Sequence, residues 1–117
     1  MSQMNLAAME RAAGAAAGLM RALANEHRLM ILCQLADRER GVGELVGAVG
    51  LSQSAVSQHL ARLRAEGIVV TRRDAQAIFY SLASEEVRRV IRTLYAIYCA
   101  GPARCRPAAN PSRRKSA

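Results

Sequence analysis

Residues 51–64, LSQSAVSQHLARLR, constrain the fold of this chain more than any other segment. Val56, Leu60 and Leu63 recur at i, i+4 and i+7, which is the spacing of one buried stripe on an α-helix. The rest of this predicted helix carries short polar side chains: Gln53, Ser54, Ser57, Gln58 and His59. Amide and hydroxyl groups pair with base edges in fixed patterns, so this face suits a DNA major groove. The alternative interpretation is an ordinary solvated helix face.

The composition is typical of one small domain with an aliphatic core, and it predicts a negatively charged binding partner. Hydrophobic residues make up 51% of the 117 residues and aromatic residues only 3%. The net charge is +8, and 16 of the 17 basic residues are arginine, whose guanidinium offers the paired donors that phosphate accepts. Five of these bases and no acid lie in residues 103–117, which we expect to form a disordered tail beyond a domain over residues 1–102. The charge favours nucleic acid over an acidic small molecule.

The sequence also predicts the cellular compartment. The longest apolar run, residues 12–20, is interrupted by Gly14 and Gly18 and is far shorter than the roughly 20 residues that a membrane span needs. No basic segment of a signal peptide precedes it. The three cysteines are an odd number, so we expect a cytoplasmic protein with reduced thiols and no membrane partner.

Two helices are predicted ahead of residues 51–64. Residues 4–22 are rich in alanine, and Gly14 and Gly18 each cost such a helix about 1 kcal/mol relative to alanine. We therefore expect this helix to pack closely against a partner surface. Asn25 is a candidate N-cap for a second helix over residues 26–36. Its apolar residues cover most of its circumference, which predicts a central place in the core.

A glycine-containing turn comes directly before the polar helix. Residues 41–43 predict a break, and residues 44–49 predict a short third helix. Gly50 stands where a helix end favours a left-handed residue, and Ser52 is a candidate N-cap for the next helix, which stops at Gly67. Two helices joined by such a turn form a helix-turn-helix.

The hydrophobic period changes after this helix. Residues 68–71 and 77–82 predict two strands, with residues 72–76 between them as a basic hairpin tip. Ser84 is a candidate N-cap for a last helix that ends at residues 101–102. The apolar stripe of this helix is wide enough for both core and partner contacts and consists of Val87, Ile91, Leu94 and Tyr98.

The predicted fold is therefore mainly α with a small β-hairpin, in the order α-α-α-α-β-β-α. A helix-turn-helix followed by a two-stranded hairpin is a winged helix-turn-helix, in which one helix enters the major groove while the wing reaches nearby phosphate. The polar residues of the helix over 52–66 would read bases. The backbone contacts are assigned to Ser52, Arg62, Arg72, Arg73 and Gln76.

Three segments resemble the ArsR/SmtB family of dimeric winged-helix repressors of bacteria. They are LANEHRLMIL at residues 23–32, LSQSAVSQHL at 51–60 with Leu63 and Gly67, and the hairpin from Arg72 to residues 80–82. The resemblance covers about residues 19–100. It implies a homodimer whose interface is built by the first and last helices, and a fourth helix that reads a palindromic operator. The wing departs from the family pattern, because residues 74–76 are Asp-Ala-Gln where glycine is frequent.

The metal-binding patterns of that family are missing from this sequence. Residues 44–49 read ELVGAV where the metal-sensing branch often carries Cys-x-Cys, and residues 84–100 contain no histidine. Soft ions need grouped thiolates and borderline ions need grouped imidazoles. We expect no cofactor and neither of these metal sites.

Two cysteines instead resemble the family branch that responds to sulfide, persulfide and oxidants. Cys33 lies within the second predicted helix and Cys99 at the end of the last one. The resemblance implies that a disulfide or polysulfide between these thiols releases the DNA. The alternatives are a Cys33 that is only a small buried hydrophobe, a three-thiol As(III) site that adds Cys105, and a ligand-independent repressor.

No enzyme class is favoured by the sequence. It shows no paired nucleophile and base and no glycine-rich phosphate loop, and its two histidines, His27 and His59, fall in different elements. The hypothesis from sequence is a transcriptional repressor that binds its operator in the reduced state.

Overall fold

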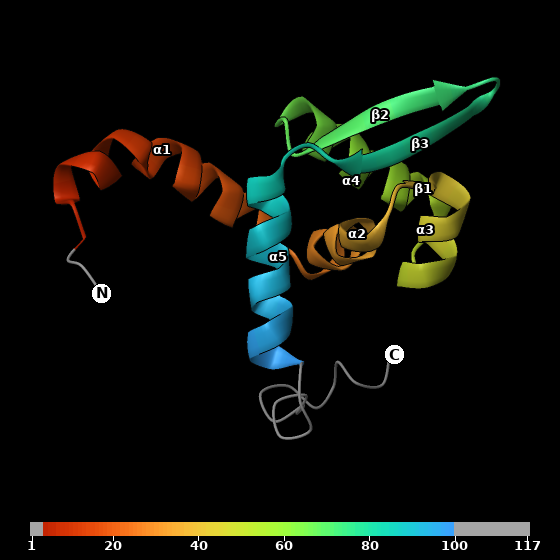
Figure 1. Cartoon of the computed structure of the whole chain (residues 1–117). Coiled ribbons are helices and arrows are strands. Elements are labelled where there is room, and N and C mark those ends of the chain that lie inside the picture. The colour runs from red at the N-terminus through yellow and green to blue at the C-terminus, as the bar shows by residue number, and fades with distance from the viewer. Residues whose placement is uncertain (1–3, 100–117) are drawn as a thin grey trace.

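The computed structural model describes residues 4–99, which form five helices and a three-stranded antiparallel sheet (Figure 1). The elements are α1 (Leu6–Leu23), α2 (Glu26–Asp37), β1 (Arg40–Gly41), α3 (Val42–Val49), α4 (Gln53–Ala65), β2 (Val69–Asp74), β3 (Ala77–Leu82) and α5 (Glu85–Tyr98). The predicted order of helices and hairpin is confirmed. The strand order is β1-β3-β2, and β1 is an addition to the prediction.

Polar caps start the helices at the predicted residues. The Asn25 side chain accepts hydrogen bonds from two backbone N–H groups of α2, Ser52 Oγ accepts one from the N–H of Ala55, and Ser84 Oγ accepts one from the N–H of Val87. Gly50 ends α3 with φ 74°, in the left-handed region where glycine avoids strain. These local signals are therefore confirmed.

The link between α2 and α3 differs from the prediction. Helix α3 begins at Val42, so residues 42 and 43 are helical and not part of a break. The cause is Glu44, whose carboxylate accepts a hydrogen bond from the N–H of Gly41 at 3.1 Å and satisfies a donor at the helix start. The two residues before α3 pair with β3, with Arg40 opposite Tyr80 and Gly41 opposite Phe79.

The wing is longer and its tip shorter than predicted. Strand β2 continues to Asp74 and pairs with β3 down to Ala77, so Arg72 and Arg73 lie within the strand and not at the tip. Only residues 75–76 connect the strands, and Ala75 has φ 59°. A two-residue hairpin turn requires such a positive φ.

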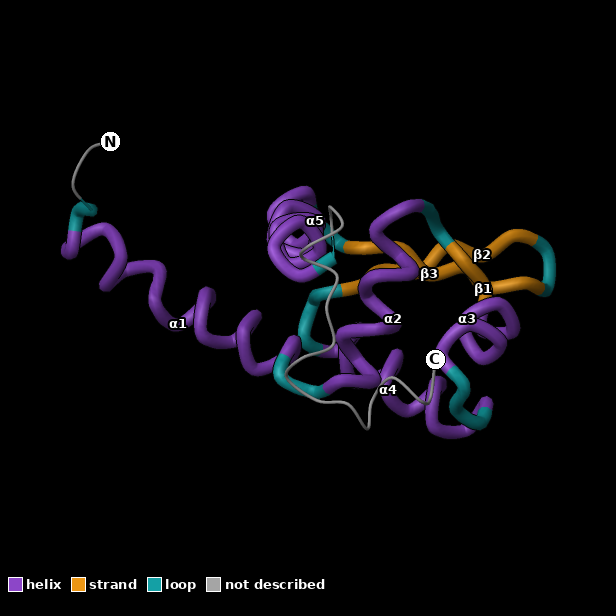
Figure 2. Tube along the Cα trace, turned by 90° about the horizontal axis from the view of Figure 1, so that it is seen from below, coloured by secondary structure: helices purple, strands orange, loops and turns teal. Residues whose placement is uncertain are grey.

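The core lies around α2, with α3, α4, α5 and the sheet packed about it (Figure 2). Leu32 and Leu35 of α2 are fully buried, as are Val56, Leu60 and Leu63 of α4. The buried stripe predicted for residues 51–64 is thus confirmed, and it turns the opposite face of α4 outward. From α5, Val87 and Ile91 join the core, while Tyr98, also predicted in that stripe, is 65% exposed.

Helix α1 extends away from the other elements as an arm (Figures 1 and 2). Only Ala22 and Leu23, at its C-terminal end, are buried, and no atom lies within 4 Å of a Cβ added at Gly14. The predicted close packing of this helix is therefore absent within the single chain. Helix α5 ends at Tyr98, and its predicted end at residues 101–102 lies outside the described residues, as do the tail over 103–117 and Cys105.

The described helices also bear on the membrane prediction. Among residues 4–99, no helix combines the length and hydrophobicity of a membrane span.

Candidate nucleic-acid interface and thiol pair

The polar face of α4 forms one continuous exposed surface. Helices α3 and α4 pack together as the helix-turn-helix and α4 also contacts β2, while the buried stripe of α4 belongs to the core. Six of the predicted DNA-contacting residues of this element are exposed: Ser52, Gln53, Ser54, Ser57, Gln58 and Arg62. The structure thus brings together amides, hydroxyls and a guanidinium, which are the groups that pair with base edges and phosphates.

His59 differs from its neighbours on α4. Its side chain is only partly exposed, and its ring centroid lies 6.2 Å from that of His27 at the start of α2. Burial lowers the pKa of His59, and the nearby charges of Arg28, His27 and Arg62 lower it further. His59 therefore lies on the flank of the helix and is predominantly neutral at pH 7, with one ring nitrogen able to accept a hydrogen bond.

An ion pair beside His59 links α2 to the end of α4. Arg28 Nη1 lies 3.8 Å from Glu66 Oε1, and the Arg28 side chain is 14% exposed. Its Nε is buried without a hydrogen-bond partner among the described residues. The sequence gives no sign of this contact, because the two residues are far apart in the chain, although Arg28 lies in the family-like segment 23–32.

The two arginines of the wing have different surroundings. The guanidinium of Arg72 donates to both carboxylate oxygens of Glu39, with Nε at 3.1 and 3.2 Å, and lies over the ring of Phe79 at 4.9 Å. The hydrogen bond from Arg72 lowers the pKa of Glu39. Arg73 and Gln76 are exposed, and Arg73 forms no ion pair or side-chain hydrogen bond within residues 4–99.

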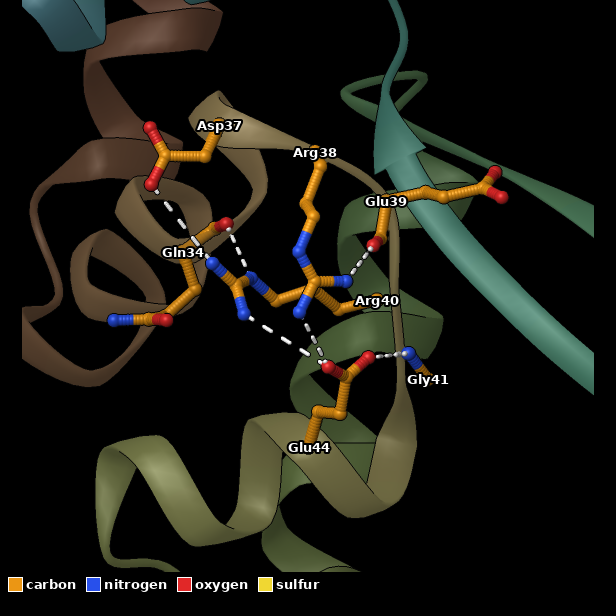
Figure 3. Close-up of polar contacts among 7 residues, drawn as sticks. All are labelled: Gln34, Asp37, Arg38, Glu39, Arg40, Gly41 and Glu44. Carbon is orange, nitrogen blue, oxygen red and sulfur yellow. Dashed lines mark hydrogen bonds and ion pairs between the residues drawn. The ribbon is translucent and has the colours of Figure 1, made fainter.

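A set of polar contacts fixes the link between α2 and α3 (Figure 3). Arg40 Nε donates to the carbonyl of Gln34 at 2.7 Å. Arg38 Nη2 donates to Glu44 Oε2 at 2.7 Å, and Arg38 Nη1 donates to the carbonyl of Glu39 at 3.1 Å. The hydrogen bonds from Arg38 and Gly41 lower the pKa of Glu44. The sequence predicted only a break at residues 41–43 in this link.

The two sequence-predicted thiols lie on α2 and at the end of α5, two helices that contact each other. Cys33 is partly buried against the core, and Cys99 is the C-cap of α5, with its N–H donating to the carbonyl of Tyr95 at 2.7 Å. Burial raises the pKa of the Cys33 thiol, and the charge of Cys99 raises it further. The two cysteines thus belong to helices that contact each other, and Cys99 influences the titration of Cys33.

Metal-ligating residues show no comparable grouping in residues 4–99. In that part of the chain, no three His, Cys, Asp or Glu side chains are arranged to hold a metal ion. Cys105, the third member of the alternative As(III) site, lies outside the described residues.

The helix-turn-helix, the adjoining wing and the exposed polar face of α4 define the class of winged helix-turn-helix DNA-binding regulators. Residues 25–71 match the model of the family described as bacterial regulatory protein, arsR family. The chain belongs to the ArsR family, as its similarity to whole members of that family also shows.

Known regulators resemble the chain over most of its length. The transcriptional activator HlyU of Vibrio cholerae is 53% identical, with 82% of this chain and 89% of that protein covered, and its solved structure gives a TM-score of 0.74 over 78% of this chain and 99% of that one. The structure of the transcriptional repressor BigR of Xylella fastidiosa gives a TM-score of 0.77 at 40% sequence identity, with 84% of this chain and 100% of that chain covered. The homodimeric winged helix-turn-helix domain of Mb0332 from Mycobacterium bovis gives a TM-score of 0.67 at 31% sequence identity, with 83% of this chain and 89% of that chain covered. The relatives are regulators of transcription and include both an activator and repressors.

Proposed function

We propose that the chain is a cytoplasmic, homodimeric repressor that binds a palindromic operator while Cys33 and Cys99 are thiols and leaves it when a disulfide or polysulfide links them. The observation that carries this proposal is the pair of thiols at the contact between α2 and α5 in a winged helix-turn-helix chain. One thiol belongs to the central helix of the core and the other to the end of the last helix, so a bond between them joins two elements that are otherwise held by packing and by the hydrogen bond from Arg88 Nε to the carbonyl of Ala36.

The proposed DNA surface consists of α4 and the wing. Base edges are read by Gln53, Ser54, Ser57 and Gln58, with His59 contributing from the flank of the helix. The backbone is contacted by Ser52, Arg62, Arg73 and Gln76, which are all exposed. Arg72 was assigned to the backbone with them; it is also exposed, and it is paired with Glu39. The exposed polar face of α4 supports this proposal, because phosphate contacts fix the register while base contacts select the sequence.

The proposed dimer uses the apolar surfaces that the single chain leaves exposed. Leu6, Met9 and Met20 of α1 and Tyr95 and Tyr98 of α5 are all at least half exposed. Exposed apolar side chains on two helices of a single chain are typical of surfaces that bind another protein. The homodimeric state of the Mycobacterium bovis domain supports the same assembly. Two copies related by a two-fold axis present two α4 helices to half-sites about 34 Å apart.

The chemistry of release follows from thiolate exchange. A Cys thiolate attacks the outer sulfur of a persulfide R–S–SH, which breaks the S–S bond, releases RSH and leaves Cys–S–SH on the protein. The second thiolate then attacks the protein-bound sulfur of that group and expels hydrogen sulfide, leaving a disulfide. If both cysteines first carry the extra sulfur, loss of one hydrogen sulfide leaves a three-sulfur bridge. The raised pKa of Cys33 favours Cys99 as the first nucleophile, because thiolate and not thiol attacks.

The link changes DNA binding by moving the dimer helix relative to the helix-turn-helix. Helix α2 packs against α3 on one side and α5 on the other, so a shift between α2 and α5 alters the separation of the two α4 helices in the dimer. The half-sites on DNA have a fixed spacing, so a change in the separation of the two α4 helices weakens binding. Release requires only that the linked form binds the operator less tightly than the dithiol form.

Titration of the reduced protein tests this proposal. Reduced protein, its C33S and C99S variants and the double-serine variant are each bound to the tightest duplex selected from random-sequence DNA, and then treated with an organic persulfide, with As(III) or with Zn(II). The proposal expects release of the native chain by persulfide alone and of none of the variants. Release of the double-serine variant contradicts dithiol sensing, and release by As(III) supports the metalloid alternative instead.

A further inference from the structure

We propose that the two arginines of the wing have different roles: Arg72 and Glu39 form a clamp that positions the wing on the helix-turn-helix, and Arg73 is the wing residue that binds phosphate. This inference rests on the proposed contact between the wing and DNA. It assigns a role to Glu39, which no sequence motif singled out, and it replaces the sequence assignment of Arg72 to the DNA backbone.

The clamp spans the full width of the sheet. Phe79 lies on the central strand β3, with Gly41 of β1 as its partner on one side and Arg72 of β2 on the other. The Arg72 guanidinium lies over the Phe79 ring at 4.9 Å and donates to both oxygens of Glu39, which comes directly before β1. A bidentate guanidinium–carboxylate pair fixes orientation as well as distance, and the aromatic ring adds a cation–π contact. The guanidinium is thus held from two sides.

The anchor of the clamp is itself firmly held. The carbonyl of Glu39 accepts a hydrogen bond from Arg38, and Arg40 is bonded to the carbonyl of Gln34 at the end of α2 (Figure 3). Glu44 of α3 accepts from Arg38 and from Gly41. Glu39 therefore belongs to the same network as the start of α3, so the contact with Arg72 ties the wing to the first helix of the helix-turn-helix.

The local charge argues against Arg72 as a phosphate ligand. Arg72 lies beside two carboxylates, Glu39 in the bidentate pair and Asp74 at 3.9 Å. One positive and two negative charges leave this cluster with a net charge of −1, which does not attract phosphate. To bind DNA, Arg72 would have to give up the Glu39 carboxylate, which already accepts hydrogen bonds from its paired donors, in exchange for a phosphate.

Arg73 has the opposite environment. It follows Arg72 in an extended strand, so its side chain points to the other face of the sheet. Its partner across the ladder is the apolar Ile78, it is exposed, and it has no ion pair within the described residues. An arginine whose donors are not engaged by protein is available to phosphate.

The two roles predict opposite effects of removing an acid from the wing region. If Glu39 only held back a phosphate-binding Arg72, E39Q would free that arginine and tighten DNA binding. If the clamp positions the wing, E39Q weakens binding although it removes a negative charge. D74N is the matched control, because it also removes one negative charge beside Arg72 and leaves the bidentate pair with Glu39 intact.

Binding of the reduced full chain to the selected duplex is measured over a range of salt concentrations for the native chain, E39Q, D74N, R72A, R73A and the double variant E39Q/R72A. We expect R73A to reduce the slope of log K against log salt by about 1. E39Q and R72A each weaken binding severalfold, the double variant is no weaker than R72A, and D74N binds at least as tightly as the native chain. Thermal melts show whether each variant is folded.

Footprinting supplies the readout that general destabilisation does not give. If the clamp positions the wing, the duplex bound by E39Q loses hydroxyl-radical protection where the wing contacts the DNA backbone. It keeps the protection of guanine N7 where α4 lies in the major groove. Tighter binding by E39Q, additive losses in the double variant, or an unchanged salt slope in R73A overturns the inference. These outcomes leave the proposed function intact as long as the native chain binds the duplex, whereas failure of the native chain to bind any duplex refutes the proposed function itself.

Discussion

Substitution of Leu60 by alanine tests the packing that presents α4 to DNA. Leu60 is fully buried in the middle of the stripe that holds α4 on the core. The change removes three carbon atoms, and at about 0.8 kcal/mol for each buried carbon the transfer term is about 2.4 kcal/mol. The cavity left behind adds to this term, so we expect a loss of about 3 kcal/mol in the free energy of unfolding.

Urea denaturation followed by circular dichroism measures this loss at fixed protein concentration. Met30→Ala is the matched control, because it also removes three heavy atoms from a helix but from a side chain that is 46% exposed. We expect the control to cost less than half as much as L60A. Equal losses in the two variants, or a loss below about 1 kcal/mol for L60A, would refute the idea that the buried stripe fixes the orientation of α4.

Three further predictions concern single residues of the interface and the thiol pair. Gly50→Ala places a Cβ at φ 74° and lowers the free energy of unfolding by about 1 kcal/mol in a thermal melt; an unchanged melting temperature would argue against the left-handed turn. Arg62→Ala reduces the salt slope of DNA binding by about 1 without changing the selected sequence; an altered base preference would instead assign Arg62 to base reading. Because burial is the larger cause that raises the pKa of Cys33 above its ordinary value of 9.0 and does not depend on Cys99, iodoacetamide modifies Cys33 in the C99S chain slowly at pH 7 and progressively faster as the pH rises past 9; a rate that levels off below pH 8 contradicts the raised pKa.

The elements that the sequence predicted best are those set by local chemistry. Asn25, Ser52 and Ser84 cap their helices because each offers a side-chain acceptor to an adjacent N–H group. The stripe of α4 was predictable because its spacing has the helical period. Residues 40–41 were not recognised as a strand, since two residues carry no period and their partner on β3 is far along the chain.

The surroundings of two predicted site residues depend on contacts between distant segments, which the sequence does not reveal. Arg72 was assigned to phosphate from its place near a hairpin tip, but its partner Glu39 lies 33 residues earlier. His59 counted as part of the polar face, whereas His27 of another helix lies against it. Charge patterns along one segment do not reveal such partners. The pairing of Cys33 with Cys99 came from a family resemblance, and the structure adds their electrostatic proximity.

Mass spectrometry of the persulfide-released protein tests the central claim most directly. Cleavage after arginine places Cys33 in the peptide 29–38, Cys99 in 93–104 and Cys105 in a third peptide, so each pairing gives a distinct linked mass. Protein bound to the selected duplex and protein released by persulfide are separated and digested without reduction. Dithiol sensing predicts that peptides 29–38 and 93–104 are joined, directly or through added sulfur, in the released fraction alone. Release with these two peptides unlinked, or with the link equally abundant in the DNA-bound fraction, would contradict it.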